Sequence, residues 1–177
     1  PSPKLSLSPA LAVGAESDAE FLEAEFALPV PAADVPVNLA PHLPAGIRVT
    51  GAMGVPPGSP RLSDFDIASD WSLRPLPPFP LPGEVTPGRA AERLAAFHAS
   101  DRHPLVLTRE DRTSEIDLKP IVRTFGVNPD GISITIIQGT GKGVRPLEAA
   151  ASLLGVPLSP ERFIPRKVSA ELIPRRG

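Results

Sequence analysis

A glycine-rich turn followed by a helix has the residue types that bind an anion. Gly139, Gly141 and Gly143 belong to the turn together with Lys142, and Arg145 follows where the helix starts. Backbone N–H groups at a helix start attract anions, and the two basic side chains add positive charge. These residues predict a binding site for a phosphate group. The alternative is a turn whose glycines only supply positive φ angles.

The spacing in this turn differs from that of the known nucleotide-binding loops. The lysine of a P-loop is followed by serine or threonine, whereas Lys142 is followed by Gly143. A dinucleotide fingerprint needs another glycine spacing and a different βαβ unit around it. The prediction is therefore limited to a site that holds one phosphate of a larger ligand.

Two carboxylates two residues apart form the second candidate site. Glu115 and Asp117 alternate with apolar residues, so a strand would place both carboxylates on one face. Such a pair can coordinate a divalent cation or take part in acid–base catalysis. The alternative is a solvated strand face whose charge is balanced by Lys119, Arg112 and Arg123.

Basic residues gather near the end of the chain. Residues 1–88 carry 4 basic and 10 acidic residues, a net charge of −6, whereas residues 89–177 carry 14 and 10, a net charge of +4. Arg162, Arg166 and Lys167 lie in the last predicted strand, and with Lys142 and Arg145 they can form a surface that binds phosphates. RNA is the candidate ligand, although the aromatic residues of an RNA-recognition signature are absent. The alternative is ordinary variation in surface charge.

Several kinds of chemistry are excluded or left without support. The chain has no cysteine, so it has no disulfide, thiolate nucleophile or cysteine metal site. The three histidines lack metal-ligand spacing, and no Gly-x-Ser-x-Gly motif is present. We therefore predict no cofactor and no metal. The absence of a signal peptide and of an apolar run near the ~20 residues of a membrane span predicts a cytoplasmic protein.

The second half of the chain alternates between strand and helix patterns. The best helix begins after Thr86, which can cap it, with Pro87 at the first helical position. Strands are predicted over residues 65–73, 104–108, 115–119, 121–127, 133–137 and 162–173, and helices over 86–98 and 144–154. Two β–α–β halves that share one antiparallel sheet are typical of a ferredoxin-like unit. The prediction is an α+β protein.

The first half follows the same plan less completely. Strands are predicted over residues 4–8, 21–27 and 46–50, the first two paired, with a short helix over 31–43 interrupted by prolines. This pattern predicts a first ferredoxin-like unit that lacks its N-terminal strand and helix. Glycine and proline mark a boundary, which predicts a truncated first unit over 1–54, a linker over 55–64 and a second unit over 65–177.

Three stretches resemble a known family. Residues 1–23 contain Pro-Lys-Leu-Ser, Pro-Ala-Leu and Glu-Phe-Leu-Glu, residues 114–120 read Ser-Glu-Ile-Asp-Leu-Lys-Pro, and a glycine-rich turn precedes Arg145-Pro146. Together they resemble the bacterial radical-SAM-linked protein family, with departures at Leu7 and Ala12. That family is of unknown function and is often encoded beside, or fused to, a cobalamin-binding radical-SAM protein. The resemblance implies a radical-SAM partner, and an N-terminal segment before the first motif.

The function predicted from these observations is a non-catalytic accessory or substrate-binding module that works with a radical-SAM partner. RNA is the candidate substrate, on the charge distribution and on fold analogy. The alternative is an enzyme whose carboxylate site at Glu115 and Asp117 is completed by the N-terminal segment. No membrane contact is predicted.

Overall fold

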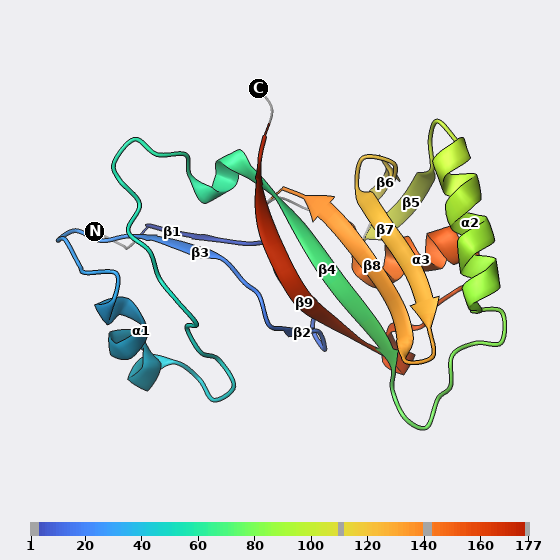
Figure 1. Ribbon diagram of the computed structural model, residues 1–177, viewed down its shortest axis with the longest axis horizontal. Helices are drawn as coiled ribbons and strands as arrows, with labels where there is room; N and C mark the ends of the chain where they lie inside the picture. The colour runs from blue at the N-terminus through green and yellow to red at the C-terminus, as the bar shows by residue number, and fades with distance from the viewer. Residues whose placement is uncertain (1–3, 110–111, 140–142, 176–177) are drawn as a thin grey trace.

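The computed structural model describes residues 4–109, 112–139 and 143–175 (Figure 1), and their fold is a mixed α+β arrangement, as predicted. We refer to residues 4–61 as the N-terminal region and to residues 62–175 as the body. The elements of the N-terminal region are β1 (Lys4–Leu7), β2 (Glu16–Ser17), β3 (Leu22–Glu25), α1 (Asp34–Leu39) and the short 3-10 helix η1 (Ala40–His42). Those of the body are η2 (Leu62–Asp64), β4 (Phe65–Pro75), α2 (Pro87–Ala99), β5 (Pro104–Arg109), β6 (Arg112–Asp117), β7 (Val122–Asn128), β8 (Gly131–Gln138), α3 (Pro146–Leu154), η3 (Pro160–Arg162) and β9 (Phe163–Pro174).

A five-stranded sheet organises the body, with the strand order β2-β9-β4-β8-β7. The long strand β4 lies between β8 and β9 and is antiparallel to both. Strand β2 comes from the N-terminal region and adds to β9 in parallel, with Glu16 opposite Arg166. Strands β5 and β6 pair only with each other among the described strands, so this hairpin is an insertion between α2 and β7.

The core lies between the sheet and the two longer helices. Alternate residues of β8, namely Ile132, Ile134 and Ile136, are buried on one face of the sheet. They join apolar residues of α2, α3 and the β5–β6 hairpin in one hydrophobic cluster. Figure 1 shows α3 and the hairpin behind the sheet, with α2 beside them. The alternation of β8 therefore has the pattern expected of a sheet covered by helices on one face.

Local signals position both longer helices. The Thr86 Oγ1 accepts a hydrogen bond from the Arg89 backbone N–H at 3.2 Å, and Pro87 is the first residue of α2, so the predicted start is confirmed. Helix α3 starts at Pro146 and ends before Gly155, whose φ of 65° is left-handed. None of the described helices is long and apolar enough to cross a membrane.

The N-terminal region does not match the predicted first unit. Strands β1 and β3 pair as predicted, but residues 46–50 form no strand. The alternation there has no neighbouring strand to pair with, Gly46 has a φ of 91°, and Ile47 is exposed. Two ferredoxin-like units are thus not confirmed, since residues 4–61 contain a hairpin and a six-residue helix and give one strand to the sheet of the body. The domain boundaries over 1–54, 55–64 and 65–177 stay a prediction.

Candidate functional site

The start of α3 is already occupied by side chains of the chain itself. The Val144 N–H donates to Gln138 Oε1 at 3.1 Å, and the Arg145 N–H donates to Glu148 Oε2 at 2.9 Å. The same Glu148 carboxylate pairs with Arg109 at 2.9 Å. Glu148 therefore places a negative charge of the chain itself at the helix start, where such a charge is favourable. Of the predicted anion site, Gly141 and Lys142 lie outside the described residues.

The two described glycines of the turn leave room for neighbouring side chains. A Cβ atom added at Gly139 would collide with the guanidinium of Arg175, and one added at Gly143 would collide with the side-chain amide of Gln138. Gly139 does not have a positive φ. Both obstructing groups are the ends of flexible side chains, so these contacts show that Arg175 and Gln138 pack closely against the turn. The two interpretations of the turn both stay predictions.

The predicted carboxylate pair is bound by neighbouring groups. Arg102 lies 3.2 Å from Glu115 and 3.8 Å from Asp117, so the basic partner is a residue that the sequence did not indicate. Backbone N–H groups of His103 and Lys119 donate to Asp117 Oδ1 at 2.9 and 3.1 Å. The hydrogen bond from His103 has the largest effect on the pKa of Asp117, and the one from Lys119 the next largest. Both lower it.

Lys119 does not share the strand face of the two carboxylates. Strand β6 ends at Asp117, and the Lys119 ammonium donates to the carbonyls of Phe97 and His98 at 2.8 and 3.2 Å. It therefore binds the last turn of α2, where a cation is favourable. No group of three or more histidine and acidic side chains suited to a metal occurs in the part of the chain that the structure describes.

Two residues of the predicted basic surface, Arg166 and Lys167, bind acidic residues of the N-terminal region. The Arg166 guanidinium binds both carboxylate oxygens of Asp18, at 2.7 and 2.9 Å, and also lies 3.9 Å from Glu16. The Asp18–Arg166 hydrogen bonds lower the pKa of Asp18 and raise that of Arg166. Arg162 stands over the Phe79 ring at 4.8 Å.

Lys167 is the most buried basic residue of this group, because its side chain is only 3% exposed. Its ammonium lies 2.6 Å from Glu20 Oε1 and 5.3 Å from the centre of the Trp71 ring. Glu20 also accepts hydrogen bonds from the hydroxyls of Ser8 and Ser17. Lys167 is therefore part of an internal polar cluster between the two regions.

Residues 1–146 match a family described as an uncharacterized protein conserved in bacteria, DUF2344. The chain belongs to the DUF2344 family. Searches of curated proteins and of solved structures each find no match. The resemblance noted in the sequence is thus confirmed as far as an uncharacterized bacterial family. The DUF2344 description names no reaction, ligand or partner, so a function has to be argued from this geometry.

Sequence reasoning missed an apolar surface in this DUF2344 chain. In the β1–β3 hairpin Leu7 lies opposite Leu22, and Leu5 lies opposite Ala24, which places these four side chains on one face. The three leucines are 55–61% exposed. We call this surface the apolar hairpin face. The alternation in residues 4–8 predicted a strand with one buried face, and the structure leaves that face uncovered among the described residues.

Proposed function

We propose that this chain is a non-catalytic accessory module that binds a radical-SAM protein through the apolar hairpin face. The partner is the one that the family resemblance implies. The exposure of Leu5, Leu7 and Leu22 on one face of a hairpin is the observation that supports this docking surface. A contiguous exposed apolar face marks an interaction site, and a two-stranded hairpin is only marginally stable by itself. Binding of a partner would cover the leucines and stabilise the hairpin.

The charged candidates of the chain support a binding role over a catalytic one. Asp117 and Glu115 share Arg102, and Asp117 also binds two backbone N–H groups. Arg166 and Lys167 each bind a carboxylate of the N-terminal region. Each of these four side chains thus has a partner within the chain.

The test is complex formation with a radical-SAM protein from the organism that encodes this chain, measured by calorimetry and by co-elution on a sizing column. We expect the wild-type chain to form a complex and the double variant Leu7→Asp, Leu22→Asp to lose it. Val106→Asp is the matched control, because Val106 is 60% exposed on the separate β5–β6 hairpin. A complex that survives the double variant, or the absence of any complex, contradicts the proposal. A wild-type dimer that the same variant abolishes would assign the face to self-association instead.

We infer further that residues 65–174 form one ferredoxin-like unit with the β5–β6 hairpin inserted. The element order β4-α2-β7-β8-α3-β9 and the sheet order β9-β4-β8-β7 support this inference. Within this scheme residues 1–54 and the linker 55–64 stand outside the unit, as the predicted boundaries require. Expression of residues 65–177 tests the division: a soluble, cooperatively unfolding fragment would support it, and an unfolded fragment would contradict it.

The two other predicted functions have direct tests. Titration with structured RNA at two salt concentrations tests RNA binding, which has to weaken as salt rises. The pairing of Arg166 and Lys167 leaves this prediction with less support than the apolar hairpin face. For the alternative of an enzyme, alanine at both Glu115 and Asp117 should abolish activity, and unchanged activity would exclude these residues from catalysis.

A further inference from the structure

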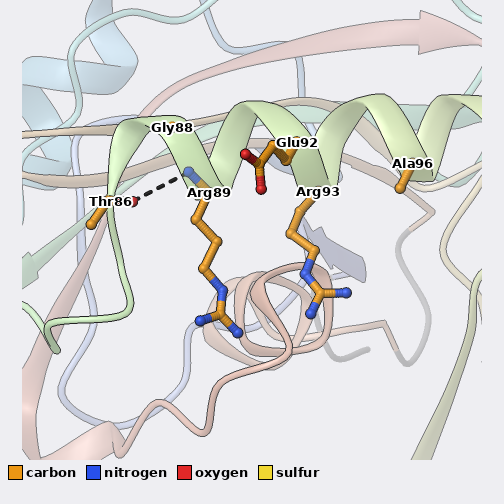
Figure 2. A pocket seen from close by; sticks show the side chains of 6 residues that line it. All are labelled: Thr86, Gly88, Arg89, Glu92, Arg93 and Ala96. Carbon is orange, nitrogen blue, oxygen red and sulfur yellow. Dashed lines mark hydrogen bonds between the residues drawn. The ribbon is translucent and has the colours of Figure 1, made fainter.

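A shallow polar groove follows the side of α2 from which Arg93 reaches the turn after α3. Its volume is about 690 Å³, and it is wide open to solvent. The core side of the helix carries the buried residues Ala90 and Phe97. The lining residues of the groove are Thr86, Gly88, Arg89, Glu92, Arg93 and Ala96. Figure 2 shows these side chains, with Arg89 and Arg93 extending together to one side of the helix.

The two arginines stand one helical turn apart, since a spacing of four residues corresponds to a rise of about 6 Å. No ion pair of either guanidinium is found among the described residues, whereas Arg74, Arg109 and Arg166 each pair with a carboxylate. Glu92 lies between the two arginines on the helix but forms no ion pair with them in the described structure. The groove therefore contains two guanidinium groups that lack a carboxylate partner among the described residues.

Neither Arg89 nor Arg93 lies at the C-terminal end of α2, where a positive charge would stabilise this helix most. Arg89 is in the first turn of α2, which contains no acidic residue, and a cation there opposes the helix dipole. The Arg93 guanidinium lies against the turn after α3, because a Cβ atom at Gly155 would be only 3.1 Å from its Nη2. This contact limits the positions that the Arg93 guanidinium can take, so less of its freedom is lost when a ligand binds.

We propose that this groove binds a phosphate group of a small molecule, held by Arg89 and Arg93. Planar guanidinium groups match the oxygens of phosphate with two parallel hydrogen bonds each. The Glu92 carboxylate lines the same groove and can accept a hydrogen bond from a hydroxyl, which favours a phosphate ester of a polyol or nucleoside. This site lies on α2, apart from the apolar hairpin face, and does not depend on the proposed radical-SAM partner.

Calorimetric titration with inorganic pyrophosphate tests the proposal on the full chain. We expect binding that weakens as salt rises, and at least about tenfold weaker binding in the double variant Arg89→Ala, Arg93→Ala. The matched control is Arg48→Ala, Arg61→Ala, which removes the same charge from exposed positions in the N-terminal region and at its border with the body. Absence of binding to the wild-type chain, or equal weakening in both double variants, would overturn the proposal. Malonate binding as strong as that of pyrophosphate would overturn the assignment to phosphate.

The single variant Arg89→Glu separates ligand binding from a structural role. An acidic residue in the first turn suits the helix dipole, and it stands four residues before Arg93, a spacing that favours an ion pair. We therefore expect an equal or higher melting temperature together with loss of pyrophosphate binding. A lower melting temperature with unchanged pyrophosphate binding would make Arg89 a structural residue and overturn its role in the site.

Discussion

The body and the N-terminal region are held in place by different forces. In the body, α2, α3 and the strands bury one continuous apolar cluster, with Leu73, Ile136 and Leu154 fully buried. In the N-terminal region Ser8 is the one described residue that is buried, and many of the large apolar side chains are exposed. The region is attached by the short β2–β9 pairing, by Leu11 and Ala15, which pack against the core of the body, and by three carboxylates that bind Arg166 and Lys167.

This difference explains the uneven charge of the sequence. The acidic first half and the basic second half suggested that one half faces an anionic partner. In the structure three of the ten acidic residues of the first half bind Arg166 and Lys167 of the same chain, namely Glu16, Asp18 and Glu20. Charge segregation along a sequence can therefore indicate an intramolecular contact as well as a nucleic-acid surface.

The largest expected effect is in the core of the body. Leu154→Ala removes a fully buried side chain at the end of α3 and should cost about 3 kcal/mol of unfolding free energy. Leu22→Ala, in the exposed hairpin, should change it by less than about 0.5 kcal/mol. Urea unfolding of both variants is the measurement. Similar losses would mean that the two regions form one cooperative core.

The next effect concerns the buried ion pair between the regions. Glu20→Gln leaves the Lys167 ammonium without its carboxylate and should cost about 2 kcal/mol, somewhat less than a fully buried pair because Glu20 is partly exposed. Glu25→Gln is the control, since Glu25 pairs with Lys4 in solvent, and it should cost no more than about 0.5 kcal/mol. Urea unfolding at neutral pH compares the two. An equal loss of unfolding free energy in both variants would show that burial of Lys167 does not strengthen its ion pair.

Acid should weaken the body through Asp70. Hydrogen bonds from Ser169 Oγ and then from Thr135 Oγ1, both 2.6 Å, lower the pKa of Asp70 in the folded chain. The resulting stability is complete above the unfolded pKa and is lost as the pH falls through the folded pKa. Asp70→Asn should therefore reduce stability near pH 7 and show a smaller loss between about pH 5 and pH 2. Melting temperatures of both proteins across that pH range are the measurement. If the melting temperature of Asp70→Asn falls with pH as steeply as that of the wild-type chain, Asp70 does not contribute to the acid sensitivity.

The smallest effect on global stability is expected at Asp18, although its local effect should be clear. Its carboxylate binds Arg166, and its N–H donates to the Lys167 carbonyl at 2.8 Å. Asp18→Asn should speed hydrogen exchange of that amide while the unfolding midpoint hardly moves, because the pair is exposed. Exchange rates measured by NMR test this. Unchanged exchange at Asp18 would show that the backbone pairing alone holds β2.

Features set by neighbouring residues were predictable from the sequence. The start of α2 follows from Thr86 and Pro87, whose effects act within one turn. The turn after β7 follows from Asn128, whose side chain accepts the Asp130 N–H at 2.9 Å, and from Gly131, whose φ is 147°. Such signals need no knowledge of the rest of the chain.

Features that depend on distant partners were not predictable. Glu20 and Lys167 are 147 residues apart, and nothing in either segment indicates the other. Residues 46–50 have the alternation typical of a strand, but no described strand lies beside them, and they form no strand. In the candidate site, the carboxylates at 115 and 117 were correctly placed on a strand, but their partner Arg102 comes from the loop after α2.

The short strand β2 also bears on how the chain avoids aggregation. It pairs with β9 only at Arg166 and Lys167, so much of the outer side of this twelve-residue strand is left without a described partner. Unpaired backbone groups of that kind recruit strands from other molecules, and a short, charged covering strand is one way in which proteins prevent this. Glu16 and Asp18 bind Arg166 and so help to hold this charged covering strand at the edge of the sheet.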